Sequence, residues 1–178
     1  MKTLYIVRHA KSGWEHGVKT DFDRTLSKRG MRTAPLMASV LKEKKVMPDL
    51  VISSPANRAI TTAKLFCEVL NYPDNLIQQK FELYEGETGV LLDTIREIPD
   101  SCRTAMIFGH NPCLLEFANL FPGKKVDSFA PCGIVRIDLD VRFWKESAYS
   151  KGKTICYEMP EKHTYPVLNP VPPSDREP

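Results

Sequence analysis

The chain has 178 residues, of which 42% are hydrophobic and 26% charged, and its formal net charge at pH 7 is +3. This length favours one domain with its own core, and the small net charge gives no strong field to attract nucleic acid or an anionic membrane. No apolar run is long enough to span a membrane, and Arg8 interrupts the apolar start before a signal-peptide core forms. We therefore expect a cytoplasmic protein with neither a membrane nor a nucleic-acid partner.

The five cysteines, an odd number without a Cys-x-x-Cys pair, argue against both a disulfide framework and a zinc ribbon. Most of them are expected to be buried thiols. Any metal site would have to be drawn from residues whose spacing fits no zinc pattern: His9, His16, His110, Cys113 and Cys132. We expect no metal and no other cofactor.

The first predicted element is a short apolar stretch, Leu4 to Val7, that ends abruptly in Arg8 and His9. A run of this length indicates a buried strand. In an open α/β sheet, ligands bind outside the carboxyl ends of the strands, so the Arg-His pair marks a candidate site. The same pair could also be a solvated turn, and the choice depends on the partners that the rest of the chain supplies.

Residues 13–26 show neither a helical nor a strand period and predict a loop, after which Ser27 caps a helix that Pro35 kinks or delays. A second short strand is expected over 49–53, with Ser54 as the N-cap and Pro55 as the first residue of the next helix. Arg58 then lies in the first helical turn. A cation is unfavourable there unless an anion is bound, although a solvated surface arginine is the alternative.

A weak strand over 76–80, an acidic loop over 81–87 and a short helix come next, followed by a strand over 104–108. Asn111 is predicted to cap the following helix and Pro112 to begin it, which places His110 beside a helix N-terminus that can bind an anion. Alternating strands over 135–141 and 155–159 predict an antiparallel extension of a mostly parallel sheet. The proline-rich end from residue 160 predicts an extended tail that could wrap the body or reach a partner.

Four basic side chains therefore follow or flank strand ends that share one edge of a parallel sheet: Arg8, His9, Arg58 and His110. Two guanidinium groups and two imidazoles beside helix N-termini suit a dianionic oxyanion, and a phosphoryl group in particular. The two arginines oppose protonation of His9 and so keep its imidazole nucleophilic, whereas a protonated His110 would add a further positive donor.

Four motifs occur in a fixed order: Arg8-His9-Ala10-Lys11-Ser12; Asp23-Arg24 with Leu26, Ser27 and Gly30; Ser53-Ser54-Pro55 with Arg58, Thr61, Thr62 and Ala63; and Gly109-His110-Asn111-Pro112. Over residues 1 to about 140 this order resembles the histidine phosphatase superfamily, and within it the short SixA-type phosphohistidine phosphatases. The resemblance implies a phosphoglycerate mutase-like fold, a three-layer α/β/α sandwich around a mostly parallel mixed sheet. We expect a single histidine-phosphatase domain over 1–160 and a tail over 161–178.

The resemblance also implies that His9 is the nucleophile, that Arg8, Arg58 and His110 surround the phosphoryl group, and that no metal is needed. Further residues expected to touch the phosphate or the substrate are Lys11, Ser12, Arg24 and Asn111. The general acid is poorly specified, since Glu82, Glu85 and Glu87 compete without a clear motif. The SixA type lacks this acid, and a phosphoramidate can dispense with it because a protonated imidazole is a good leaving group.

The expected activity is therefore dephosphorylation of phosphohistidine on a signalling or transport protein, and mutase activity is not expected. The alternatives are a small-molecule phosphomonoesterase of the same superfamily and a non-catalytic phosphoprotein-binding module. Asp21-Phe22-Asp23-Arg24-Thr25 also fits the Asp-x-Asp-x-Thr pattern of magnesium-dependent phosphatases, but the required strand does not precede it. The sequence leaves the oligomeric state open.

Overall fold

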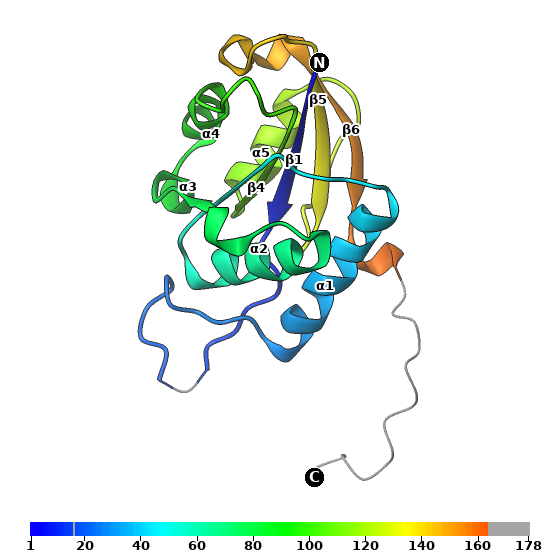
Figure 1. Cartoon of the computed structure of the whole chain (residues 1–178). Helices are drawn as coiled ribbons and strands as arrows, with labels where there is room; N and C mark the ends of the chain where they lie inside the picture. Colours follow the sequence, from blue (N-terminus) through cyan, green and yellow to red (C-terminus); the bar gives the residue numbers. More distant parts are fainter. Residues whose placement is uncertain (16, 164–178) are drawn as a thin grey trace.

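The computed structural model describes residues 1–15 and 17–163, which form a six-stranded mixed sheet (Figure 1). Its strand order is β3-β2-β4-β1-β5-β6. The first four strands of this order are parallel, whereas β5 and β6 run antiparallel to their neighbours, as the sequence predicts. The strand bounds are β1 Lys2–Arg8, β2 Leu50–Ser53, β3 Gln78–Gln79, β4 Thr104–Gly109, β5 Ile134–Leu139 and β6 Gly152–Glu158.

Helices cover both faces of this sheet. Along β1 the side chains of Leu4 and Ile6 point into one apolar cluster, and those of Tyr5 and Val7 into another. Because successive strand residues face opposite sides, a strand that is apolar at every position must be buried on both faces. This burial confirms the three-layer α/β/α arrangement.

One face of the sheet packs against α1 and α2, and the other against α4 and α5. The α-helices in the described part of the chain are α1 Lys28–Glu43, α2 Asn57–Leu70, α3 Glu82–Glu85, α4 Thr88–Arg96 and α5 Cys113–Leu120, and short 3-10 turns connect several elements. The Ser27 hydroxyl accepts a hydrogen bond from the backbone N–H of Gly30, so the predicted cap of α1 is confirmed. Pro35 lies inside α1 and does not delay its start.

Two predicted helix starts are wrong. Helix α2 begins at Asn57 rather than at Pro55, and α5 begins at Cys113 after Pro112. In both cases the polar residue expected to cap the helix has a different partner: the Ser54 hydroxyl contacts His110, and the Asn111 amide donates to the carbonyl of Phe129. The expected acidic loop over 81–87 is also different, since it contains the short helix α3.

The carboxyl ends of β1, β2 and β4 lie at one edge of the sheet because these strands are parallel. Strand β5 runs the opposite way, so its beginning, Ile134, pairs with Val7 at the same edge. The segment that leads into β5 therefore adds backbone groups from residues 129–133 to the place where Arg8, His9 and His110 emerge. Residues 17–26 lie in a loop beyond this edge (Figure 1).

The end of the described chain also differs from the expected extended tail. Residues Pro160–Lys162 form one 3-10 turn, and Glu161 lies 3.8 Å from Arg29 on α1. Residues 164–178, which hold most of the predicted tail, lie outside the described residues, so the domain boundary near 160 stays a prediction. Within the described part of the chain no helix has the length and hydrophobicity needed to cross a membrane, and the cytoplasmic location also stays a prediction.

Candidate active site

His9 directly follows β1, and its side chain is only 9% exposed. Its Nδ1 lies 2.8 Å from the carbonyl oxygen of Ala10. Because a carbonyl can only accept, Nδ1 carries the ring proton of the neutral imidazole and Nε2 keeps a free electron pair. The Arg58 Nε donates a hydrogen bond of 3.3 Å to this Nε2. The backbone therefore holds the ring so that its unprotonated nitrogen faces Arg58.

Burial of His9, the first cause, lowers its pKa to about 4, and the positive charges of Arg58, Arg8 and Arg24 act in the same direction. The hydrogen bond to Ala10 opposes this shift without reversing it. The imidazole of His9 is therefore uncharged at neutral pH, which is the form that can attack an electrophile.

Arg8 is the last residue of β1, and the segment before β5 holds it on both sides. Its backbone N–H donates to the carbonyl of Gly133, and its carbonyl accepts from the N–H of Cys132, both at 3.1 Å. The Arg8 Nη1 donates to the carbonyl of Phe129 at 2.8 Å. Its Nε is buried and has no hydrogen-bond partner among residues 1–15 and 17–163. Arg8 therefore brings a fixed guanidinium with a free donor to the site.

Arg58 lies in the first turn of α2 and is only 6% exposed, so it is not a solvated surface arginine. Its Nη1 donates to the backbone carbonyl of Asp21 at 2.6 Å, and its Nη2 donates to the Asp21 carboxylate at 2.9 Å. A cation in the first turn of a helix needs a nearby anion, and for Arg58 the carboxylate of Asp21 is that anion.

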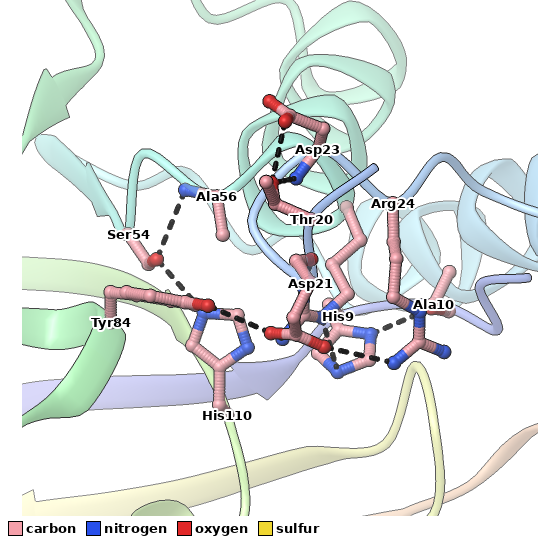
Figure 2. A network of polar contacts seen from close by, with 11 residues as sticks. His9, Ala10, Thr20, Asp21, Asp23, Arg24, Ser54, Ala56, Tyr84 and His110 are labelled. Carbon is pink, nitrogen blue, oxygen red and sulfur yellow. Dashed lines mark hydrogen bonds and ion pairs between the residues drawn. The ribbon is translucent and has the colours of Figure 1, made fainter. Parts of the chain in front are cut away.

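Asp21 is the residue that sequence reasoning missed at this site. Its carboxylate also accepts hydrogen bonds from the Tyr84 hydroxyl, at 2.8 Å, and from Arg24 Nη1, at 3.2 Å (Figure 2). Burial acts to raise the pKa of Asp21, but the hydrogen bonds from Tyr84, Arg24 and Arg58 outweigh it and lower the pKa to about 2. Asp21 therefore stays ionised at neutral pH. The buried Arg58, which needs an anion, was the signal that could have identified it.

The Asp-x-Asp-x-Thr alternative finds no support in this geometry. Asp23 hydrogen-bonds to the Thr20 hydroxyl, whereas Asp21 is held by arginines, so the two carboxylates do not converge. No cluster of three or more histidine, cysteine or acidic side chains suited to a metal ion occurs among the described residues. His16, which was part of the metal set considered from the sequence, lies outside these residues.

His110 follows β4 and is 8% exposed, with its ring centroid 5.2 Å from that of His9. Its Nε2 lies 2.8 Å from the Ser54 hydroxyl. Its Nδ1 is buried and has no hydrogen-bond partner in the described part of the chain. Burial, followed by the neighbouring His9 and Arg58, lowers the pKa of His110 to about 3. His110 is therefore neutral at pH 7, so the condition under which it would add a positive charge is not met.

The other substrate-contact candidates are divided between this site and its surroundings. Asn111 and Arg8 share the Phe129 carbonyl as their acceptor, and Arg24 contacts Asp21 with its guanidinium 5.2 Å from the ring of Trp14. Ser12 instead pairs with Leu26 in an isolated bridge, and Lys11 lines a separate cavity of about 170 Å³ beside α1. The structure thus brings Asn111 and Arg24 to the site, but it shows no contact of Lys11 or Ser12 with the two histidines.

Of the three competing glutamates, Glu82 and Glu85 lie on α3, whereas Glu87 is the residue before α4. Glu82 lines a small hollow with His110, and Glu85 lines a cavity of about 180 Å³ with His110 and Asn111. The aromatic side chain between them, Tyr84, instead reaches into the site, with its ring centroid 5.6 Å from that of His110. Among the described contacts, neither glutamate hydrogen-bonds to the four basic residues. The identity of a general acid stays a prediction.

Comparison with known proteins connects this geometry to a family. Residues 4–107 match the model of the histidine phosphatase superfamily (branch 1). An uncharacterized protein of Mycobacterium tuberculosis is 32% identical over 106 residues, a match that covers 60% of this chain and 63% of the relative. The chain thus spans less than two thirds of that relative's length.

Two solved structures share the fold. The protein histidine phosphatase SixA, complexed with tungstate, superimposes with a TM-score of 0.77 at 24% identity, over 90% of this chain and 98% of that one. A phosphoserine phosphatase mutant from Entamoeba histolytica superimposes with a TM-score of 0.62 at 13% identity, over 90% and 98%. At these identities the likeness shows the fold, which is phosphoglycerate mutase-like. Because the family model matches more than half of its length, the chain belongs to the histidine phosphatase superfamily.

Proposed function

We propose that this protein is a metal-independent phosphatase that acts through a phosphohistidine intermediate on His9 and dephosphorylates phosphohistidine on a protein. One observation carries the proposal: the unprotonated Nε2 of His9 lies in a buried site, where it accepts a hydrogen bond from Arg58 and neighbours Arg8 and a second histidine. Family membership supports phosphatase chemistry. The fold shared with a protein histidine phosphatase supports the choice of substrate.

In the proposed reaction, the hydrogen bond from Arg58 Nε to His9 Nε2 breaks, and Arg58 turns to the phosphoryl oxygens. The electron pair of His9 Nε2 then attacks phosphorus, and the bond from phosphorus to the leaving nitrogen breaks. The leaving imidazole takes the bonding pair and departs neutral, because its other ring nitrogen already carries a proton. Water then attacks the phosphorus, the bond to Nε2 breaks, and that electron pair returns to His9. The products are orthophosphate, a proton and the starting enzyme.

The cationic groups around His9 stabilise the charge on the transferring phosphoryl oxygens. Two buried donors, Arg8 Nε and His110 Nδ1, have no partner among the described residues and suit this purpose. The Arg58 N–H groups become available once Asp21 yields them to the phosphoryl group. A dianionic phosphoryl group offers more charge and more acceptor atoms than one carboxylate, which favours this exchange.

The protonation states at the site support a phosphoramidate substrate over an alkyl ester. Asp21 is the carboxylate within the hydrogen-bond network, and with a pKa lowered to about 2 it holds no proton to give at neutral pH. An alkoxide needs a proton in order to leave, whereas an imidazole protonated on its second nitrogen does not. The shared fold with a phosphoserine phosphatase keeps a small phosphate ester as the alternative substrate.

The test measures phosphate release in excess EDTA from three substrates: a protein phosphorylated on histidine with phosphoramidate, p-nitrophenyl phosphate and phosphoserine. The variants are wild type, His9→Ala and His163→Ala, the last a control because the partly buried His163 pairs with Glu158 and with none of the four basic residues. We expect wild type and His163→Ala to hydrolyse the phosphohistidine protein fastest. We expect His9→Ala to lose at least about a thousandfold in rate, since no nucleophile remains.

The other outcomes identify the alternatives. Preferential hydrolysis of phosphoserine would support the small-molecule phosphomonoesterase, and loss of turnover in EDTA would contradict the metal-independent mechanism. Binding of the phosphoprotein without turnover would support a binding module. Equal turnover by wild type and His9→Ala would show that the site around His9 is not the catalytic one.

A further inference from the structure

The hydroxyl of Ser54 contacts His110 in the interior of the protein, where Ser54 is 0% exposed. It stands just after β2, and its Oγ accepts a hydrogen bond of 3.2 Å from the backbone N–H of Ala56. The same Oγ lies 2.8 Å from His110 Nε2, at the end of the neighbouring strand β4 (Figure 2). Ser54 was expected to cap a helix, and this contact is a role that the sequence does not reveal.

Hydrogen-bond accounting decides the direction of the contact between Ser54 and His110. A serine hydroxyl has one proton and two acceptor sites, and the Ala56 N–H occupies one of the acceptor sites. If His110 Nε2 carried a proton and donated it to Oγ, the hydroxyl proton of Ser54 would have no acceptor among the described residues. A buried, unpaired hydroxyl proton is costly. If the hydroxyl donates to Nε2 instead, every group of Ser54 is paired and only the Nδ1 N–H of His110 has no partner among the described residues. The opposite arrangement leaves two groups unpaired, the Ser54 proton and the Nδ1 electron pair.

We infer that Ser54 is a positioning residue that fixes His110 as the neutral tautomer with its proton on Nδ1. Figure 2 shows Nε2 on the side of the ring that faces Ser54 and the other ring nitrogen on the side of His9 and Asp21. In this tautomer the buried Nδ1 is an N–H donor directed at the position of the transferring phosphoryl oxygens. The opposite tautomer would direct a lone pair at those oxygens. The role assigned to this donor rests on the proposed function.

This assignment has two consequences for the chemistry. Protonation of His110 would reverse the bond at Nε2 and leave the Ser54 proton unpaired, so the serine hydroxyl opposes the imidazolium form. A neutral imidazole that gave up its Nδ1 proton would also become an anion beside a phosphate. His110 therefore acts as a hydrogen-bond donor rather than as a general acid. The leaving group must depart without receiving a proton from His110.

The tautomer can be measured on the free wild-type protein by NMR of imidazole rings labelled with nitrogen-15, which shows which ring nitrogen of His110 carries the proton. We expect Nδ1 to be protonated, and we expect Ser54→Thr, which keeps the hydroxyl, to give the same pattern. A wild-type spectrum with the proton on Nε2 would overturn the inference. This measurement needs no turnover, so an inactive wild type with Nδ1 protonated would contradict the proposed function and still support the assignment.

Steady-state kinetics of variants at Ser54 and Ser53 are a second test of this inference. Ser53→Ala is the matched control, because Ser53 is also 0% exposed and its hydroxyl donates to the Ser54 carbonyl, at 2.8 Å, without touching His110. We expect Ser54→Ala to lower kcat about tenfold with little change in KM, since one oriented donor is lost. We also expect the nitrogen-15 pattern of its His110 to change, and we expect Ser54→Thr and Ser53→Ala to stay near wild type. Equal kcat in Ser54→Ala and wild type, with an unchanged spectrum, would overturn the inference.

Discussion

The site has two regions that are built differently. Its floor consists of residues at strand ends and a helix start, of which Arg8 is half-buried and the others are buried: Arg8, His9, Ser54, Arg58 and His110. Its rim consists of the loop over 13–26 together with α3. The floor residues are fixed by the backbone of the sheet and its connecting segments, as in the hydrogen bond from His9 to Ala10. The rim is held by partly exposed polar contacts, and the side chain of Asp21 is 46% exposed.

The difference shows that burial sets the protonation of the two histidines, whereas the exposed charges of the rim set the pairing of Arg58. Burial removes the charge from His9 and His110, and so it supplies a neutral nucleophile and a neutral donor. The rim keeps its charges, and one of them, Asp21, neutralises Arg58 as long as no phosphoryl group does so. Under the proposed function, the floor performs the chemical step, and Asp21 on the rim competes with the incoming phosphoryl group for Arg58.

The largest effect separates an arginine of the floor from one of the rim. We expect Arg58→Ala to lower kcat/KM about a thousandfold, because a buried guanidinium next to the transferring phosphoryl group is lost. We expect Arg24→Ala, which removes a partly exposed cation, to lower it only about tenfold. Steady-state kinetics with p-nitrophenyl phosphate measure both. If Arg58→Ala and Arg24→Ala lower kcat/KM by similar factors, the floor and the rim do not differ in their contribution to activity.

A second prediction concerns the pH dependence that burial of the two histidines imposes. Their pKa values fall from 6.5 to about 4 for His9 and to about 3 for His110, so below pH 6.5 the unfolded chain binds protons that the folded chain does not. The free energy of unfolding therefore falls as the pH drops from 7 through 6.5 toward 4. The urea midpoint at pH 5 should lie below that at pH 7.

A double variant, His9→Gln with His110→Asn, isolates this contribution, and His163→Ala is its control. The fall in the urea midpoint between pH 7 and pH 5 should shrink in the double variant and persist in the control. Activity should behave differently from stability, because His9 stays unprotonated far below neutral pH. With p-nitrophenyl phosphate, whose leaving group needs no proton, we expect kcat/KM between pH 8 and pH 5 to follow the ionisation of the phosphate alone, with no ionisation of the enzyme. A loss of activity centred near pH 6.5 would contradict the lowered pKa of His9.

A third prediction concerns the anion that the rim supplies. In Asp21→Asn the Arg58 N–H groups no longer face a charged competitor, so inorganic phosphate should inhibit about fivefold more tightly. Asp23→Asn is the matched control, because Asp23 lies on the same loop but bonds to Thr20 rather than to an arginine. Inhibition constants for phosphate measure the effect. Weaker phosphate binding in Asp21→Asn would mean that Asp21 orients Arg58 instead of competing for it.

The smallest effect concerns the aromatic part of the rim. Phe81 is 61% exposed, and its ring stacks on that of Phe22 with centroids 6.0 Å apart. We expect Phe81→Ala to lower the free energy of unfolding by only about 0.5 kcal/mol, because little of its surface is removed from water on folding. Chemical denaturation measures this change. A loss of several kcal/mol would show that the rim is as firmly built as the floor.

The positions of the polar caps show why part of the local structure could not be predicted. Ser54 and Asn111 both have side chains that suit a helix N-cap, and each is followed by a proline that suits a helix start. In the structure these side chains bind His110 and the Phe129 carbonyl instead. Such side chains choose among several partners, and a partner far away in the sequence does not enter a local pattern.

The sequence alone determined the architecture and the basic residues of the candidate site. Burial of β1 on both faces follows from its continuous apolar run, and parallel strands necessarily bring Arg8, His9 and His110 to one edge. Only the tertiary structure brought Asp21 to Arg58, the Tyr84 hydroxyl to Asp21 and the Ser54 hydroxyl to His110. The physical reason is range: strand and helix patterns depend on neighbouring residues, whereas these hydrogen bonds depend on the relative positions of segments that meet only when the sheet forms.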